Sequence, residues 1–581
     1  MYSAEMNSLK KEKKGVAEPA STLRHDIFLI SAMSLLACCG LIYEYLLAHY
    51  AGRILGAVES SIYAMIGIMI VAMGIGAFLA KWIKCPYKGF VWLELGIALV
   101  GSCSILIMAV MMAVTYTLPQ WLQSIYGLPS SITTSGGFVA TAKTLSFFTP
   151  FIIGFFLGLM IGMEIPLIAR VREHVHGQHL AHNTGTIYGA DYIGAGIGAA
   201  IWVIFCLRHP IMLTAITTAS VNLSVGVLFL WRYRSKLLKP LKLWLAHLVL
   251  VVTVITLGIY GTGWIEKLNY ALFQDKPIYS KQTSYQNITL TERYLGQGLP
   301  QVYSLYLNGR LQFSSSDERI YHSLLTYPPL LVSARHDSIL VIGGGDGLAL
   351  RDILQWQPQK VTLIELDADM IQLFSGKAID ATAKINTILL ELNEDSFNSP
   401  KVEVIEGDAF IEVEHLISAG RHFDTIIVDL PDPSHPDLNK LYSDFFYSRL
   451  YSLLNGDGAI AIQSTSPYHA RNAFISIGKT LASVNFITEQ YHANVPTFGE
   501  WGWTIGTKMG KSASQRIKDI KKLPLIDQWI SKAQLNAAFV FSPNFYAKEK
   551  EVDVNRLGSH LLYQYHKKSW GKQDGVFFSH Q

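Results

Sequence analysis

The chain has 581 residues, of which 50% are hydrophobic and only 16% charged, and its formal net charge is +4. This length exceeds that of one ordinary domain, and the small net charge gives no indication of nucleic-acid binding. The cysteines all lie in the N-terminal half and none has a zinc-ligand spacing, so we expect neither a disulfide framework nor a metal site. They are Cys38, Cys39, Cys85, Cys103 and Cys206.

Long apolar runs dominate the N-terminal half, and each is long enough for a membrane span, which needs about 20 residues. The runs cover about 27–49, 58–80, 91–116, 146–169, 185–207, 210–231 and 243–263. The first is too long for a cleavable signal peptide and is followed by six more. We therefore expect an α-helical polytopic membrane domain of about seven spans.

Basic residues gather in alternate loops of this half, which indicates its orientation. They precede the first run, follow the second and fourth, and separate the sixth from the seventh: Lys10, Lys11, Lys13, Lys14, Arg24, Lys81, Lys84, Lys88, Arg170, Arg172, Arg232, Arg234, Lys236, Lys239 and Lys242. The other loops contain only Arg53, Lys143 and Arg208. This asymmetry predicts a multi-pass protein of the cell (inner) membrane with a cytoplasmic N-terminus.

Four acidic residues, Glu44, Glu94, Glu164 and Asp191, lie within or at the edge of the runs. Carboxylates inside a membrane are costly, which favours a functional role such as an ion or amine path. Pairing with Tyr, His or Arg neighbours near helix ends is the alternative. The sequence leaves both open.

The C-terminal half has the pattern of a soluble α/β domain. After a connector at 266–282, the segments 283–292 and 301–313 alternate like paired strands, and a helix is expected at about 317–333. The apolar run 338–342 then leads into Gly343-Gly-Gly-Asp-Gly347 and a helical stretch. Strand, glycine-rich turn and helix form a Rossmann-like arrangement, in which glycines let the backbone approach a ligand.

Acidic residues stand at the ends of the next three predicted strands. Glu365 ends 360–365, Asp408 follows 401–405, and Asp429 follows 424–428. In an open parallel sheet, ligands bind in the crevice at the carboxyl ends of the strands. We therefore expect these three acids to face one crevice.

The glycine-rich turn alone fits a dehydrogenase, a methyltransferase or an aminopropyltransferase. Asp346 stands within the turn, where its charge would repel the pyrophosphate of a dinucleotide. The position where a methyltransferase usually carries an acid is Val341. The remaining option for the ligand of this turn is a cationic nucleoside that bears an amine.

Six blocks of the chain resemble the spermidine synthase family, particularly its membrane-fused members. The blocks are Thr283-Ser-Tyr-Gln-Asn-Ile288, Gln312-Phe with Asp317-Glu-Arg-Ile-Tyr-His322, Gly343–Gly347, Glu365, Gly407-Asp-Ala409 and Asp429-Leu-Pro-Asp-Pro433. With the membrane half, the resemblance implies a polar tail at 1–26, spans in 27–264, a connector with a small β-hairpin region at 265–313, a Rossmann-like domain at 314–515 and an extension at 516–581.

The resemblance also implies a reaction, transfer of an aminopropyl group from decarboxylated S-adenosylmethionine to a primary amine, without a resident cofactor. Asp429 would be the base; His322, Asp346, Asp432, Tyr321 and Gln312 would bind the amines; Gln286, Gly343, Gly345, Glu365, Asp408, Ala409 and Pro436 would bind the donor. Because an ammonium has no lone pair, a carboxylate that takes its proton suits this chemistry. The expected partners are a polyamine, the donor and the lipid bilayer, with a homodimer left open.

Departures from the soluble enzymes touch the acceptor end, so putrescine is the default acceptor. Ser323 replaces a usual Glu, Phe498 stands where a Tyr is common, and the loop 435–440 lacks the usual glycines. Alternatives are a membrane-delivered or non-standard amine, a binding-only transporter or sensor, and a methyltransferase. Asp429 and Asp432 could also be turn and cap residues before a helix at about 439–454.

The charge pattern conflicts with the expected chemistry. Seven spans place the C-terminal half outside the cytoplasm, whereas the donor is a cytosolic metabolite. Either the count of spans is off by one, with 117–145 as the stretch where a re-entrant segment could lie, or the C-terminal half faces outward; the face stays open. The extension includes a predicted helix at 523–537 and suggests no function.

Overall fold

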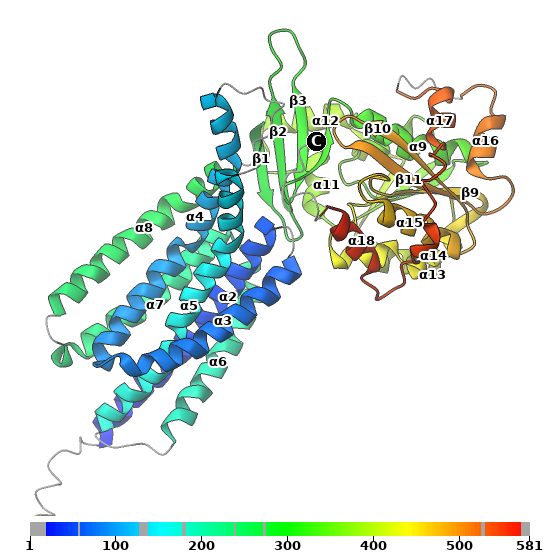
Figure 1. Cartoon of the computed structure of the whole chain (residues 1–581). Helices are drawn as coiled ribbons and strands as arrows, with labels where there is room; N and C mark the ends of the chain where they lie inside the picture. Colours follow the sequence, from blue (N-terminus) through cyan, green and yellow to red (C-terminus); the bar gives the residue numbers. More distant parts are fainter. Residues whose placement is uncertain are drawn as a thin grey trace, which may run out of the picture. The chain divides into compact units, whose positions relative to one another are not determined.

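The computed structural model describes residues 19–55, 58–126, 137–176, 182–237, 240–270, 273, 275–523 and 529–570. The chain forms two compact units that divide between Gln274 and Asp275 (Figure 1). The first is called the helical unit, and the second is called the catalytic unit after the activity that its sequence motifs predict. Among the predicted features, the basic residues Lys10, Lys11, Lys13, Lys14 and Lys239 lie outside the described residues.

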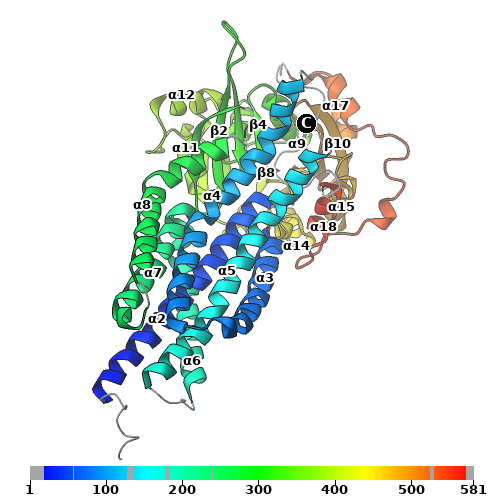
Figure 2. The ribbon, with the colours of Figure 1, turned by 60° about the vertical axis from the view of Figure 1, so that its left-hand side comes forward.

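Seven long apolar helices make up the described part of the helical unit, as the sequence predicts. They are α2 (Pro19–Leu55), α3 (Val58–Leu79), α4 (Pro86–Tyr126), α5 (Phe138–His176), α6 (Asn183–Ile204), α7 (Ile211–Arg232) and α8 (Pro240–Tyr270). Figure 2 shows them packed side by side. Each is long enough to cross a bilayer, so their number and length suit a membrane domain.

Glycines let two pairs of these helices approach closely. A Cβ at Gly162 of α5 would lie 2.0 Å from the carbonyl oxygen of Met73 in α3, and one at Gly194 of α6 would lie 1.9 Å from that of Ser34 in α2. No other residue fits such contacts without moving a backbone. Small residues at helix contacts are typical of membrane bundles, where backbones pack against each other.

Polar contacts join the basic loops at one end of the bundle. Arg172, near the end of α5, donates to Asp26 at the start of α2 over 2.9 and 3.0 Å, and Arg170 donates to the carbonyl of Ile83 over 2.8 Å. The segment 117–145 contains no re-entrant turn in its described part, because α4 continues to Tyr126 and α5 begins at Phe138. Residues 127–136 lie outside the described residues, so the side of the membrane on which the C-terminal half lies stays open.

The catalytic unit begins with a small antiparallel sheet in the order β1-β2-β3-β4. Its strands are β1 (Lys276–Gln282), β2 (Asn287–Arg293), β3 (Val302–Leu307) and β4 (Arg310–Ser314). The expected connector at 266–282 is wrong, because α8 extends to Tyr270 and the rest includes β1. Pro277 and a register shift between Pro277 and Tyr279 interrupt the alternation that would reveal this strand.

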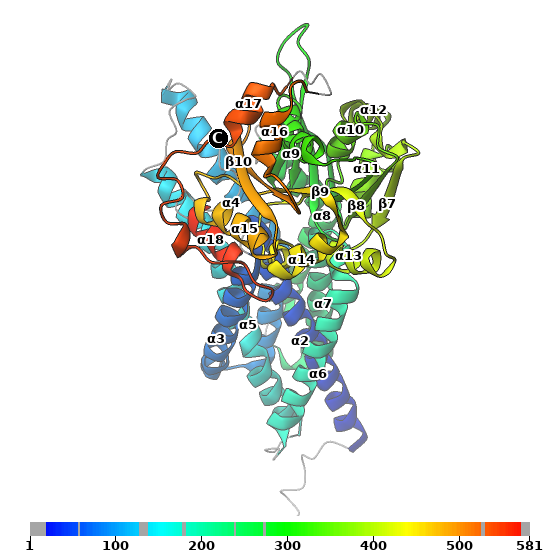
Figure 3. The same ribbon diagram turned by 90° about the vertical axis from the view of Figure 1, so that its right-hand side faces the viewer.

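A seven-stranded sheet in the order β10-β11-β9-β8-β5-β6-β7 forms the centre of this unit (Figure 3). Its strands are β5 (Ser338–Gly343), β6 (Lys360–Glu365), β7 (Val402–Glu406), β8 (Phe423–Asp429), β9 (Leu454–Gln463), β10 (Ile487–Val495) and β11 (Gly499–Thr507). Strands β9, β8, β5, β6 and β7 are parallel to one another. Strand β11 pairs antiparallel with β9, and β10 pairs antiparallel with β11. The order reverses beside β5, which is where ligands bind such sheets.

Alternate residues of β5 face two separate cores, as the two-residue period of a strand requires. Ile339 and Val341 join a core that includes α9 (Glu318–Val332), α10 (Leu348–Leu354), α11 (Ala368–Phe374) and α12 (Ala383–Leu392). Leu340 and Ile342 join a core with α13 (Ala409–Ser418), the 3-10 helix η5 (Pro436–Tyr442), α14 (Asp444–Leu453), α15 (Arg471–Ser483) and Leu562 of the final helix. The sheet is therefore covered on both faces.

The C-terminal extension contains more structure than the sequence predicts. After α16 (Ala513–Asp519), α17 spans Lys532–Ala538 only, so the described part of the predicted helix at 523–537 is shorter than expected. The predicted helix at 439–454 begins later, as α14. A final helix, α18 (Leu561–Trp570), was not predicted, and its Leu562 is fully buried.

Candidate active site

The glycine-rich turn brings three strand ends together. A Cβ at Gly343 would lie 2.2 Å from the carbonyl oxygen of Asp429, and one at Gly345 would lie 2.8 Å from the Oε2 atom of Glu365. The turn therefore needs glycine for close approach, and the positive φ of +79° at Gly343 adds a conformational reason. Asp429 and Glu365 thus flank the turn after β5.

Asp429 ends β8, with one oxygen held and the other beside the turn. The hydroxyl of Tyr321 donates to its Oδ1 atom over 2.8 Å. Its Oδ2 atom would lie 3.3 Å from a Cβ at Gly344, so glycine leaves the space before it open. Burial raises the pKa of Asp429, although the His322 charge and the Tyr321 hydrogen bond oppose the shift.

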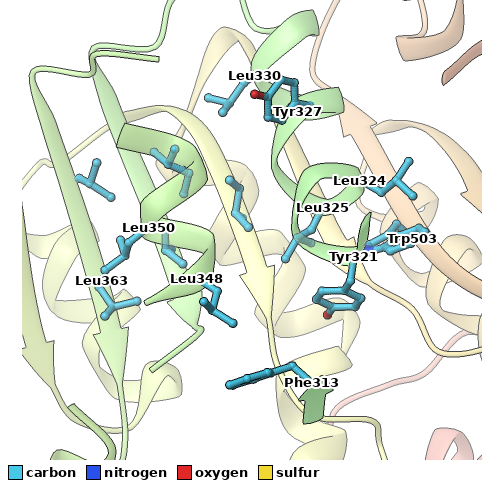
Figure 4. Packing of buried hydrophobic residues seen from close by; sticks show 14 of the residues in the cluster. Phe313, Tyr321, Leu324, Leu325, Tyr327, Leu330, Leu348, Leu350, Leu363 and Trp503 are labelled. Atoms are coloured by element: carbon cyan, nitrogen blue, oxygen red, sulfur yellow. The ribbon is translucent and has the colours of Figure 1, made fainter. Parts of the chain in front are cut away.

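Tyr321 is positioned by the aromatic end of the first core (Figure 4). Its ring centroid lies 5.6 Å from that of Trp503 and 6.2 Å from that of Phe498. Trp503 is fully buried and stacks on Tyr491, which ties the tyrosine to the antiparallel strands. The aromatic packing therefore fixes the hydroxyl that holds Asp429.

His322 follows Tyr321 and belongs to a buried ionic network. Its Nδ1 atom lies 2.9 Å from the Oε2 atom of Glu318, and Arg351 donates one hydrogen bond to each oxygen of that carboxylate. Burial lowers the pKa of His322, but the Glu318 hydrogen bond and charge outweigh it and raise the pKa to about 9. The imidazolium also interacts with the charges of Asp346 and Asp429.

Asp346 lies in the turn itself, where its Oδ1 atom accepts a hydrogen bond of 3.0 Å from the backbone nitrogen of Leu348. Burial raises the pKa of Asp346 to about 6, and the nearby Asp429 charge contributes while His322 opposes. The turn carries a negative charge where a dinucleotide site binds phosphate. The geometry agrees with the exclusion made from the sequence.

Glu365 at the end of β6 is linked to the segment before β2. The backbone nitrogen of Asp367 donates to Glu365 over 3.0 Å, and Gln286 and Thr283 both donate to the Oδ2 atom of Asp367, over 2.9 and 2.8 Å. Burial raises the pKa of Glu365 to about 7. Gln286 therefore lies beside the strand end, and the buried Asp367, which the sequence did not single out, joins them.

Asp408 caps α13, accepting a hydrogen bond of 2.9 Å from the Phe410 nitrogen. Its second oxygen forms an ion pair of 2.6 Å with Lys440 of η5. Ala409 and Pro436 are buried, the first opening α13 and the second opening η5. The Lys440 partner was not predicted, because it is 32 residues away in the chain.

Asp432 lies three residues after Asp429, and several groups bind its carboxylate. Gln463 donates to its Oδ1 atom over 2.7 Å and Thr465 to its Oδ2 atom over 3.1 Å. The Nε2 atom of His566, from α18, lies 3.2 Å from Oδ2. Burial opposes its ionisation, but the His566 hydrogen bond and charge hold the pKa of Asp432 below its usual range.

A hydrogen-bond network fixes the C-terminal extension to η5. Asn555 is fully buried; it accepts from the Asn439 side chain over 3.0 Å and donates to the carbonyls of Asn439 and Tyr442. The backbone nitrogen of Tyr563 donates to Asn439. This network places His566 on Asp432, a contact that no local sequence pattern reveals.

The side chain of Gln312 donates only locally in the described structure, to the carbonyls of Arg310 and Leu311 in its own strand. Phe498, which stands where the soluble enzymes commonly have Tyr, lies against Tyr321. Ser323 is buried. Of the differences from the soluble enzymes, Phe498 therefore lies beside Tyr321, whose hydroxyl donates to Asp429.

Acidic side chains gather at the carboxyl ends of β5, β6 and β8. Asp346 lies in the glycine-rich turn, and Glu365 and Asp429 flank it. Asp432 comes three residues after Asp429. The charge of His322 interacts with those of Asp346 and Asp429. Ionised carboxylates attract ammonium and sulfonium groups. Within the described residues no group of three or more His, Cys, Asp or Glu side chains could hold a metal ion.

Residues 318–518 match the Spermine/spermidine synthase domain family. A polyamine aminopropyltransferase of Shewanella oneidensis is 53% identical over 551 residues, with 95% of this chain and 96% of that protein covered. A polyamine aminopropyltransferase 1 of Streptomyces coelicolor is 32% identical, with 97% of this chain and 99% of that protein covered. Both similarities include the helical unit.

Among solved structures, a spermidine synthase in complex with the transition state analogue AdoDATO is 25% identical, with a TM-score of 0.39. The match covers 47% of this chain and 88% of that one. A spermidine synthase from Thermotoga maritima is 24% identical with the same TM-score, covering 48% of this chain and 87% of that one.

Proposed function

Because the chain belongs to the polyamine aminopropyltransferase family, and is therefore an aminopropyltransferase, we propose that putrescine is its acceptor and Asp429 its base. The single observation that carries the assignment of the base is the geometry of Asp429. One oxygen is held by Tyr321, and the other lies beside a turn whose glycine leaves its approach open.

In the proposed reaction, the acceptor nitrogen attacks the aminopropyl carbon bonded to the sulfonium. The new carbon–nitrogen bond forms as the carbon–sulfur bond breaks, and sulfur keeps the electron pair in methylthioadenosine. The proton lost by the amine goes to Asp429, whose raised pKa suits a carboxylate that must accept it. The reaction needs no resident cofactor.

The remaining acids are assigned to the two cationic substrates. Glu365, with Gln286 and Asp367 beside it, lies where such sheets bind the ribose, and Asp408 and Pro436 border the same strand ends. Asp346 suits the amine of the donor. Asp432 suits the distal ammonium of a diamine, since it stays ionised and lies three residues from the base.

His322 has a different part from the amine contact that the family resemblance implies. With a pKa of about 9 it is protonated near neutral pH, so it has no lone pair to offer an ammonium. Its positive charge instead offsets the mutual repulsion of Asp346 and Asp429. We therefore propose that His322 keeps Asp346 and Asp429 ionised.

The test is release of methylthioadenosine by the purified full-length protein from decarboxylated S-adenosylmethionine and a panel of aliphatic amines. We expect the highest kcat/KM with putrescine and spermidine as the second product. A higher kcat/KM with another amine would overturn the acceptor. Release that is equally fast without any amine would show that water, not an amine, accepts the aminopropyl group.

A further inference from the structure

The turn after β9 contains an unusual backbone conformation. Thr465 has a φ of +61°, in the left-handed region, and its side chain is fully buried. A β-branched residue rarely adopts this region, because its side chain collides with the backbone. The other non-glycine residues with a positive φ in the described part of the chain are all exposed and none is β-branched: Asn308, Gln357, Glu394, Asp395 and Asn485. Thr465 therefore differs from an ordinary turn residue.

Hydrogen bonds hold the backbone of this turn in place. The Ser464 nitrogen donates to the carbonyl of Gly502 in β11 over 2.9 Å, and the Thr465 nitrogen donates to the Oε1 atom of Gln463 over 3.1 Å. A Cβ at Gly502 would lie 3.0 Å from the carbonyl oxygen of Thr465, so glycine leaves room for the turn. Strained residues persist only where their surroundings fix them, and they cluster at functional sites.

The turn directs two side chains at the carboxylate of Asp432. Gln463 donates to its Oδ1 atom over 2.7 Å, and the Thr465 hydroxyl donates to its Oδ2 atom over 3.1 Å. Both donors are buried, whereas 20% of the Asp432 side chain is exposed, so a substrate can reach the acid but not its supports. A carboxylate has about four acceptor sites. With His566 as the third donor, one site is left for a substrate ammonium.

We propose that Thr465 is a positioning residue for acceptor binding, because the strained turn after β9 directs its hydroxyl to Asp432 and orients this carboxylate toward the distal ammonium of the acceptor. The proposal rests on the assignment of Asp432 to that ammonium under the proposed function. A carboxylate that is oriented before the substrate arrives loses less conformational freedom on binding. The strain at Thr465 then serves binding rather than folding.

Steady-state kinetics of the full-length protein test this role, with the KM of putrescine and that of the donor measured separately. Thr465→Val keeps the branched shape and removes only the hydroxyl. We expect the putrescine KM to rise about 10-fold, because a hydrogen bond to a charged group is lost, with the donor KM unchanged. Thr465→Ser keeps the hydroxyl and should restore the putrescine KM of the wild type. A residue needed only for folding would lower the amount of active protein and leave both KM values unchanged.

The strain itself is tested by comparing T465A with T465G, which both lack the hydroxyl and the methyl group and differ only in the Cβ atom. We expect a higher midpoint of guanidinium unfolding for T465G, because glycine adopts a positive φ without a clash. At an ordinary position alanine is the more stable of the two. Asn485, which is exposed and has a φ of +73°, is the matched control, and N485G should change neither KM.

Two results would overturn the proposal: a putrescine KM that is unchanged in T465V, or a midpoint of T465G at or below that of T465A. The variant D432N separates this failure from that of the proposed function. If D432N raises the putrescine KM and T465V does not, only the role of Thr465 is wrong. If neither variant raises it, the distal ammonium binds elsewhere and both assignments are wrong.

Discussion

Buried acidic side chains have different hydrogen-bond partners in the two units. In the catalytic unit, Asp429, Asp432 and Glu318 each receive hydrogen bonds from protein donors. In the helical unit, Glu94 accepts a hydrogen bond from Asn222 over 3.1 Å, and its carboxyl group interacts with that of Glu164, a second acid. The catalytic unit therefore binds its acids with hydroxyl, amide and guanidinium donors, whereas the helical unit places one acid against another.

The variant R351M has the largest expected effect on stability, because it removes the cation that Glu318 and Asp352 share. In R351M, Glu318 and Asp352 lose the guanidinium that bonds both of them, which leaves buried charge unpaired. We expect a loss of about 3–5 kcal/mol of unfolding free energy. Guanidinium unfolding of the full-length protein measures it, and the exposed Arg335→Met is the control. Equal stability in both variants would show that the network is not strongly coupled.

The pH dependence of stability sharpens the same comparison. The pKa of His322 is raised from 6.5 to about 9, so its contribution is fully present below pH 6.5 and is lost as pH rises through 9. The loss is on the order of 3 kcal/mol. The difference in unfolding free energy between wild type and H322Q should therefore shrink from pH 6 to pH 9.5. A constant difference contradicts the assigned ion pair.

The proposed amine site at Asp432 is tested through KM. In D432N the carboxylate is replaced by a neutral amide, so the distal ammonium loses a charge-assisted contact. We expect the KM for the acceptor to rise about 10–100-fold, with a smaller change in kcat. Asp437→Asn, 86% exposed in the same loop, is the matched control. An unchanged KM would place the distal amine elsewhere.

The smallest expected effect concerns the C-terminal extension. H566A removes one of the three donors on Asp432 while Gln463 and Thr465 remain. We expect a rise of about 3- to 10-fold in the acceptor KM, because one hydrogen bond to a charged group is lost in part. The exposed His560→Ala should have no effect. Identical kinetics for the two variants would make His566 a packing residue.

The sequence predicted the parts of the site that follow local patterns. Seven apolar helices, the glycine-rich turn and the acids at three strand ends all appear where periodicity and strand-end rules place them. It missed β1, because Pro277 and an irregular register break its alternation. Periodicity reports which face of an element is buried, and a short irregular edge strand has no clear face.

The missed contacts join residues that are distant in the chain. His566 reaches Asp432 across 134 residues, and Asn222 reaches Glu94 across 128. The sequence marked Glu94 and Glu164 as unusual acids but could not show that they meet. Which side chains meet is decided by packing of whole helices, and one sequence holds no local record of it.

The assignment of Asp429 as base is the central claim, and single-turnover kinetics test it most directly. Wild type and D429N are mixed with saturating decarboxylated S-adenosylmethionine and putrescine, and methylthioadenosine formation is followed through one turnover. The account predicts a fall of about 10²–10⁴-fold in D429N, the usual contribution of a positioned base. A single-turnover rate equal to that of the wild type would contradict it.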